Sequence, residues 1–126
     1  MTPLSPDASA DQAVVAWLAY LTQERRASPR TVESYGAAGR RYVAFLQQHR
    51  GGGLTVGGLG GVQTAELRAW LAHLRQGEHP LAPRSLSQAL SAVRGFHRYL
   101  DRRLGVANAA VTLVRGPRIK PGAPRP

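Results

Sequence analysis

The sequence contains no cysteine, and Lys120 is the one lysine among its 17 basic residues. Without thiols the chain has no means of forming disulfides, thiolate zinc sites or a cysteine nucleophile. No apolar run approaches the roughly 20 residues that cross a bilayer, and residues 1–10 have neither the basic nor the apolar region of a secretory signal. We therefore expect a soluble, cytoplasmic protein that makes no contact with a membrane.

Acidic residues are scarce as well. Seven Asp and Glu residues stand against 17 Lys and Arg residues, which leaves a net charge of +10 and a pI near 11.5. A balance this basic favours a polyanionic partner, because phosphates attract and orient clustered arginine side chains.

Candidate catalytic groups are equally sparse. The seven acidic residues are scattered, so no two of them form an obvious acid–base pair. No two histidines stand four residues apart, as a helical metal pair requires, and Ser87 and Ser91 lack the motif that surrounds a nucleophilic serine. His97 lies on an apolar stripe and is expected to be a core histidine with satisfied polar atoms. We predict no catalytic residue, no metal, no cofactor and no small-molecule substrate for this chain.

The alternation of period two that is typical of strands is missing, and apolar residues recur at steps of three and four instead. Ser28 suits a helix cap and Pro29 the first helical position, while Thr64 suits a second cap. Gly77 and Gly105 suit the positions just after a helix. The predicted class is all-α, a small single-domain bundle of four main helices with room for a short extra C-terminal turn. The expected helices cover residues 11–26, 29–50, 65–76 and 83–104.

Two segments lack helical periodicity. Residues 51–61 hold seven glycines in eleven positions, and each would cost a helix about 1 kcal/mol relative to alanine. No Gly-Lys-Ser or Gly-Lys-Thr follows them, so we expect a flexible connector rather than a phosphate-binding loop. From Arg115 onward, four prolines exclude a stable helix. The predicted division is a flexible leader at residues 1–10, a folded domain at 11–112 and a linker at 113–126 to an absent further domain.

Two of the predicted helices carry a strip of polar residues opposite their apolar stripe. Arginine anchors phosphates or recognises guanine, and serine and glutamine bond phosphates or base edges. Alanine and glycine let a helix backbone approach a duplex closely. The strips consist of Arg30, Ser34, Ala37 and Arg41 in the second predicted helix, and of Arg84, Ser87, Gln88, Ser91, Arg94, Gly95 and Arg98 in the fourth.

The alternative to a DNA-contacting strip is an ordinary solvated helix face. Such faces mix acids with bases, often in pairs four residues apart. The fourth predicted helix has no acid between Arg84 and Leu100, which favours DNA contact there. In the second predicted helix Glu33 interrupts the pattern, so both interpretations stay open.

Three segments resemble Xer-type tyrosine recombinases, in the order and spacing of that family. They are residues 18–46, with a Ser-Pro-x-Thr-x-x-Ser-Tyr core at 28–35, then residues 67–75 and residues 85–100, followed by Arg115-Gly116-Pro117. The Arg-Gly-Pro tail is closest to the XerC-like branch. The resemblance implies a core-binding, SAM-like phage-integrase N-terminal domain, which forms half of a C-shaped clamp on DNA.

The resemblance implies a site that agrees with the two strips. It places the second and fourth helices against the major groove and adds Thr31 to the contacts. It assigns the catalytic residues of the family to a C-terminal domain that is not in this sequence, so this fragment is not expected to be an enzyme. The predicted DNA-binding residues are Arg30, Thr31, Ser34, Arg41, Arg84, Ser87, Gln88, Ser91, Arg94 and Arg98.

The leading hypothesis is that the chain binds duplex DNA with some sequence preference, at a recombination half-site. By resemblance, the parent protein breaks and rejoins DNA strands together with partner recombinase protomers, in chromosome dimer resolution at cell division. The first alternative is a helical protein-interaction bundle without DNA contact. A binder of single strands is less favoured, because stacking on bases needs exposed aromatic side chains, and both tryptophans and both phenylalanines are expected to be at least partly buried.

Overall fold

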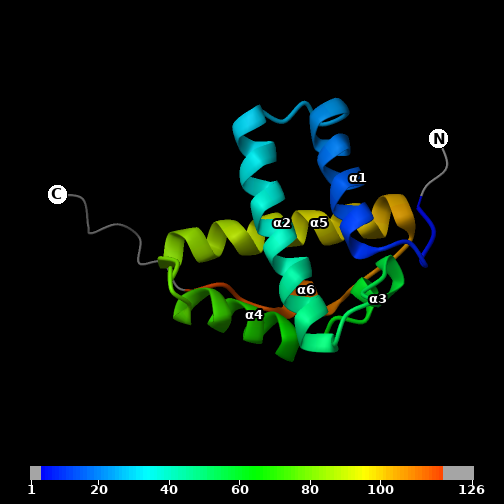
Figure 1. The fold of residues 1–126 in the computed structure, drawn as a ribbon. Helices are drawn as coiled ribbons and strands as arrows, with labels where there is room; N and C mark the ends of the chain where they lie inside the picture. Colours follow the sequence, from blue (N-terminus) through cyan, green and yellow to red (C-terminus); the bar gives the residue numbers. More distant parts are fainter. Residues whose placement is uncertain (1–3, 118–126) are drawn as a thin grey trace.

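The computed structural model of the protein describes residues 4–117, and this part of the chain contains helices and no strand. The helices are α1 (Ala10–Gln23), α2 (Pro29–Arg50), α3 (Val56–Gly60), α4 (Thr64–Gln76), α5 (Pro83–Leu104) and α6 (Ala110–Leu113) (Figure 1). The all-α class, the four main helices and the short extra turn at the C-terminal end are confirmed. Among these helices none is both long enough and apolar enough to cross a membrane.

The core lies where α2 crosses α5, with α1 antiparallel to α2 and packed beside it (Figure 1). Trp17, Tyr42 and Phe96, one from each of these helices, are buried. The ring centroids of Trp17 and Phe96 lie 5.1 Å apart. Gly39 permits the close approach of α1 and α2, because a Cβ at this position would lie 3.1 Å from the Trp17 ring. Burying a side chain such as Phe96 stabilises the fold by about 1.5–3 kcal/mol.

Local signals place the ends of the two longest helices. The Ser28 hydroxyl accepts a hydrogen bond from the Thr31 backbone N–H at 3.1 Å, and Pro29 opens α2. Gly51 follows α2 and Gly105 follows α5, both in the left-handed conformation, with φ of 82° and 71°. The bounds predicted for these two helices are therefore confirmed.

Two other helix ends differ from the prediction. α1 ends at Gln23 rather than Arg26, and Arg26 itself has a left-handed φ of 51°. The left-handed backbone at Arg26 turns the chain out of the helical path before it reaches Ser28, the cap of α2. In α4, Gln63 takes the capping position expected for Thr64, and its backbone N–H donates to the Glu66 carboxylate at 3.0 Å.

The glycine-rich segment departs most from expectation. Residues 51–53 are exposed and have positive φ, but the chain that follows packs against the core and forms α3. The buried side chains of this stretch are Leu54, Val56, Leu59 and Val62. The prediction of a flexible connector over residues 51–61 is wrong beyond residue 53. Burial of the apolar residues that stand between the glycines outweighs the helix penalty of glycine.

Residues 6–10, which were expected in the flexible leader, run alongside this segment. The Val56 backbone N–H donates to the Ala8 carbonyl at 2.8 Å, and that of Gly57 donates to the Pro6 carbonyl at 2.9 Å. Residues 6–10 are therefore part of the fold. At the other end of the domain, Val114 of the expected linker is buried, and residues 118–126 of that linker lie outside the described residues.

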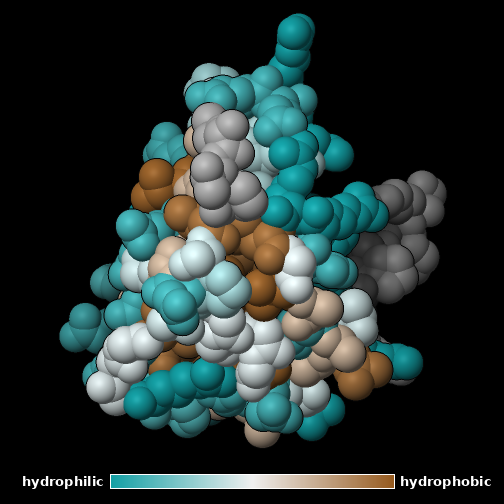
Figure 2. Space-filling view, turned by 90° about the vertical axis from the view of Figure 1, so that its right-hand side faces the viewer, coloured by the Kyte–Doolittle hydropathy of each residue, from teal (hydrophilic) through white to brown (hydrophobic). Residues whose placement is uncertain are grey.

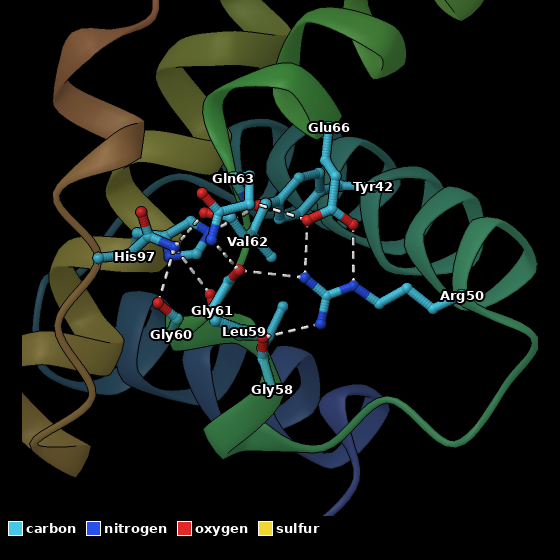
Figure 3. A network of polar contacts seen from close by, with 11 residues as sticks. Tyr42, Arg50, Gly58, Leu59, Gly60, Gly61, Val62, Gln63, Glu66 and His97 are labelled. Atoms are coloured by element: carbon cyan, nitrogen blue, oxygen red, sulfur yellow. Dashed lines mark hydrogen bonds and ion pairs between the residues drawn. The ribbon is translucent and has the colours of Figure 1, made fainter.

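Two polar side chains bind the carbonyl groups of the glycine-rich segment (Figure 3). Arg50 donates to both carboxylate oxygens of Glu66, at 2.8 and 2.7 Å, and to two carbonyl oxygens within residues 58–61, at 3.2 and 3.3 Å. Asn108 donates to three carbonyl oxygens within residues 59–62, at 2.9 to 3.3 Å. The hydrogen bonds from Arg50 lower the pKa of Glu66 to about 2. The segment is thus tied to α2, α4 and the chain after α5.

His97 is the buried polar residue of the core. Its Nε2 lies 2.7 Å from the hydroxyl oxygen of Tyr42, whereas its Nδ1 has no hydrogen-bond partner among the described residues. The prediction of a core histidine is confirmed, but only one of its two ring nitrogens is satisfied. Burial disfavours the charged imidazolium and lowers the pKa of His97 to about 4.

The surface is polar where α1 connects to α2. Seen from the side that carries α1 and α3, hydrophilic residues cover this top end, and apolar patches lie at mid-height (Figure 2). The connection includes Glu24, Arg25 and Arg26, all exposed. On this side, the end of the molecule at which α2 begins is therefore polar and carries exposed charges (Figure 2).

Candidate nucleic-acid interface

An open cleft of about 860 Å³ lies between the N-terminal halves of α2 and α5. Its lining contains arginine, serine, threonine, glutamine and one tyrosine, and no acidic residue. It therefore brings together seven of the ten residues predicted to bind DNA, from two helices that are far apart in the sequence. The lining residues are Ser28, Arg30, Thr31, Ser34 and Tyr35 on the α2 side, and Arg84, Ser87, Gln88 and Ser91 on the α5 side.

Helix periodicity explains why these side chains converge. On α5, Leu86, Leu90 and Val93 are buried against the bundle, so residues at the intervening positions face outward. Arg84, Gln88 and Ser91 are accordingly exposed, as are Arg30 and Ser34 on α2. Both strips lie on the outer side of the bundle and border the same cleft.

Two helix N-termini add positive potential to the cleft. α2 and α5 both begin with a proline next to lining residues, and Ala82 leaves α5 without a side-chain cap. The first N–H groups of a helix have no partner within the helix, and the helix dipole is positive at this end. An anion is therefore favoured at the mouth of the cleft. The Thr31 hydroxyl is oriented by its neighbour, because Ser28 donates to it at 3.0 Å.

Arg41 and Arg98 lie next to the cleft rather than in it. Arg41 lines a hollow of about 220 Å³ that shares Ser34 and Gln88 with the cleft. Arg98 lines another hollow, of about 210 Å³, that shares Tyr35 with the cleft. Both arginines are exposed. The polar surface thus extends past the cleft in two directions.

Arg94 has a different environment from the other members of its strip. It is half-buried, its Nε donates to the Val111 carbonyl at 3.4 Å, and its Nη2 donates to the Val114 carbonyl. Its guanidinium therefore holds the chain that follows α5 and does not line the cleft. The sequence pattern does not reveal this role, because the two carbonyls belong to residues 17 and 20 positions away. Contact of Arg94 with DNA stays a prediction.

The lining is rich in hydrogen-bond donors. It contains no Asp, Glu, His or Cys, so it offers hydrogen-bond donors and positive charge without an acid–base pair. Within residues 4–117, no three His, Cys, Asp or Glu side chains are placed to hold a metal ion. Arginine and hydroxyl side chains in this arrangement bind and orient phosphate oxygens.

Residues 14–103 match the family model described as "Phage integrase, N-terminal SAM-like domain". The matched range contains every lining residue of the cleft. The chain belongs to this family. No solved structure gives a significant match to it.

Curated proteins similar to this SAM-like domain carry the name tyrosine recombinase XerC. One from Bradyrhizobium diazoefficiens is 34% identical over 122 residues, which are 97% of this chain and 37% of that protein. Relatives from Mesorhizobium japonicum and Methylobacterium nodulans are 36% and 38% identical, over 100% and 91% of this chain and 39% and 35% of theirs. The chain therefore spans little more than a third of the length of these relatives.

Sequence reasoning missed two lining residues of the SAM-like domain, Ser28 and Tyr35. Ser28 was assigned only to helix capping and Tyr35 was not among the predicted contacts, although both lie in the 28–35 motif. Tyr35 has two roles: its ring lies 5.9 Å from that of Trp17, stacked, and it borders the cleft. Partial burial makes this double role possible. A periodicity pattern assigns each residue either to the core or to the surface, so it does not reveal a residue that belongs to both.

Proposed function

We propose that this SAM-like domain binds duplex DNA through the cleft between α2 and α5. The observation that carries the proposal is the gathering of arginine, hydroxyl and amide donors from two helices with no acidic residue in the lining. The major groove admits a helix, and two helices that diverge from a crossing can approach one face of a duplex together. The basic charge of the chain, +10, supports the same partner.

We assign different tasks to the lining residues by their chemistry. Arg84 and Gln88 can each make paired hydrogen bonds to a base edge, to guanine and adenine respectively, and so would provide sequence preference. Ser34, Ser87 and Ser91 have short side chains that suit phosphate oxygens and fix the register of the duplex. Arg41 and Arg98, next to the cleft, would extend the phosphate contacts.

The parent protein that we propose is a tyrosine-type site-specific recombinase. The support is the printed name of the relatives, tyrosine recombinase XerC, together with the share of about a third that this chain represents. In such a protein residues 6–114 would form the core-binding domain, somewhat more than the 11–112 expected from the sequence, and the residues after Val114 would lead to the domain that breaks and rejoins strands at a half-site. Partner protomers and a role in resolving chromosome dimers belong to this proposal.

The first test reverses the charge of one arginine in the lining of the cleft. Arg84→Glu should weaken binding of a fluorescent duplex by on the order of 1–3 kcal/mol, or about five- to 150-fold, because it removes a contact and adds repulsion. Arg68→Glu is the matched control, since Arg68 is exposed on α4 and lines neither the cleft nor its flanking hollows. Anisotropy titrations at several salt concentrations give both affinities.

Two outcomes contradict the proposal. One is an affinity for the duplex that does not change between low and physiological salt, because each neutralised phosphate should release about 0.9 of a counterion. The other is equal weakening by Arg84→Glu and Arg68→Glu, which would reduce the binding to overall charge. Either result would favour the protein-interaction bundle.

A further inference from the structure

A second basic hollow lies between α1 and α5, on the far side of Tyr35 from the cleft. Its volume is about 210 Å³, and its polar lining combines aromatic hydroxyls with guanidinium groups. Those residues, besides Tyr35, are Tyr20, Tyr99, Arg25, Arg98, Arg102 and Arg103. Of these, the sequence analysis had singled out Arg98 alone as a binding residue.

The charges of this hollow are largely uncompensated. Arg103 donates to the Glu24 carboxylate, at 3.2 Å for one of its two bonds, and its guanidinium lies 4.8 Å from the centre of the Tyr20 ring. Arg103 and Glu24 therefore satisfy each other. Within residues 4–117, Arg25, Arg98 and Arg102 form no ion pair. The hollow thus presents three arginines without an acidic partner.

The hollow continues the polar face of α5 that borders the cleft. Arg84, Gln88, Ser91, Gly95, Arg98 and Arg102 follow one another at alternate steps of four and three residues, which is one line along a helix. At 1.5 Å per residue this line is about 27 Å long. The major groove winds once around the duplex in about 34 Å, so a straight helix leaves the groove over such a length. If the Arg84 end lies in the groove, the Arg102 end meets the sugar–phosphate backbone.

We propose that the hollow binds a backbone phosphate of the same duplex, held by Arg25, Arg98 and Arg102. This inference rests on the proposed DNA-binding function and adds a contact that recognises no base. Guanidinium groups suit a phosphate because they donate paired hydrogen bonds in a fixed plane. Tyr20 and Tyr99 also line the hollow, and a tyrosine hydroxyl can donate a further hydrogen bond to a phosphate.

The experiment compares neutral variants of the intact chain. Arg25→Gln and Arg102→Gln should each reduce the magnitude of the slope of log affinity against log salt, and the double variant should reduce it by up to about 0.9, because the hollow neutralises one phosphate. Arg68→Gln and Arg75→Gln remove the same charge from exposed positions of α4 outside the hollow and should leave the slope nearly unchanged. Arg84→Gln is the reference for the cleft. Circular dichroism checks that each variant is folded.

A second readout separates a phosphate contact from a base contact. Arg102→Gln should weaken binding to duplexes of different sequence by the same factor, whereas a change at Gln88 should alter their ranking. If Arg25→Gln and Arg102→Gln behave like the α4 controls while Arg84→Gln weakens binding, the phosphate site is wrong and the cleft stands. If Arg84→Gln has no effect either, the proposed function fails with it.

Discussion

The two ends of α2 use arginine in opposite ways. At its first turn, Arg30 is exposed and lines the cleft, as does Arg84 of α5. We call the residues that line the cleft the open end. At its last turn, Arg50 bonds Glu66 and two backbone carbonyls of the glycine-rich segment. Arg50, Glu66, Asn108 and residues 54–62 form the closed end.

The difference shows that the surroundings, not the residue type, decide what an arginine does. A guanidinium in reach of a carboxylate or free carbonyls binds them and becomes part of the fold. A guanidinium that faces only hydroxyls and other arginines has N–H groups that stay available to a ligand. Arg94 belongs with the closed end by this criterion, because it holds the Val111 and Val114 carbonyls, although it lies on the same helix as Arg84.

The largest expected effect is a loss of stability on acidification, and the groups responsible lie outside the open end. The pKa of His97 is lowered from 6.5 to about 4 in the fold, so the unfolded chain takes up a proton first as the pH falls. The stability that depends on a neutral His97 should be fully present above pH 6.5. The free energy of unfolding should then fall by on the order of 3 kcal/mol between pH 6.5 and 4. Denaturant titrations across this range measure it, and His97→Phe should flatten the fall.

The carboxylate of the closed end titrates in a separate window. The pKa of Glu66 is lowered from 4.5 to about 2, so its contribution is present above pH 4.5 and is lost between pH 4.5 and 2. Glu66→Gln should remove this lower part of the fall and leave the His97 part in place. An Arg84 variant should show the wild-type profile, and a changed profile would mean that the open end also stabilises the fold.

Matched variants of Arg50 and Arg84 test the comparison directly, because one should change stability and the other should change DNA binding. Arg50→Met should lower the free energy of unfolding by on the order of 2 kcal/mol, because it leaves the Glu66 carboxylate and two carbonyls without their donor. Arg84→Met should leave stability within about 0.5 kcal/mol of wild type and weaken duplex binding instead. Denaturant unfolding and anisotropy on the same preparations give both quantities. Equal effects of the two variants on either quantity would break the comparison.

Arg94→Met should have the smallest effect, about 1 kcal/mol on stability, because it removes hydrogen bonds to neutral carbonyls at the edge of the fold. Hydrogen exchange should accelerate in residues 110–114, with little change elsewhere. Duplex affinity should fall less than for Arg84→Met. If exchange is unaffected and affinity falls as far as for Arg84→Met, Arg94 contacts DNA, as its place in the sequence strip predicts.

The features that could be predicted from the sequence are those with local causes. The ends of α2 and α5 depend on Pro29, Pro83, Gly51 and Gly105, whose backbone preferences act within a few residues. The polar strips follow from helix periodicity alone, and six of their members meet in the cleft. The flexible connector failed as a prediction because glycine content measures helix propensity and not whether neighbouring apolar residues find a core.

The sequence by itself determined an all-helical, strongly basic chain and the helix faces on which its donors lie, because cap residues, turn residues and apolar spacing act over a few positions. Only the tertiary structure decided that α2 and α5 cross so that these faces border one cleft. It also decided that Arg50 and Arg94 bind carbonyl groups while Arg25 and Arg102 share a hollow with Arg98. Such partners come from distant segments, and only packing brings them within hydrogen-bond reach.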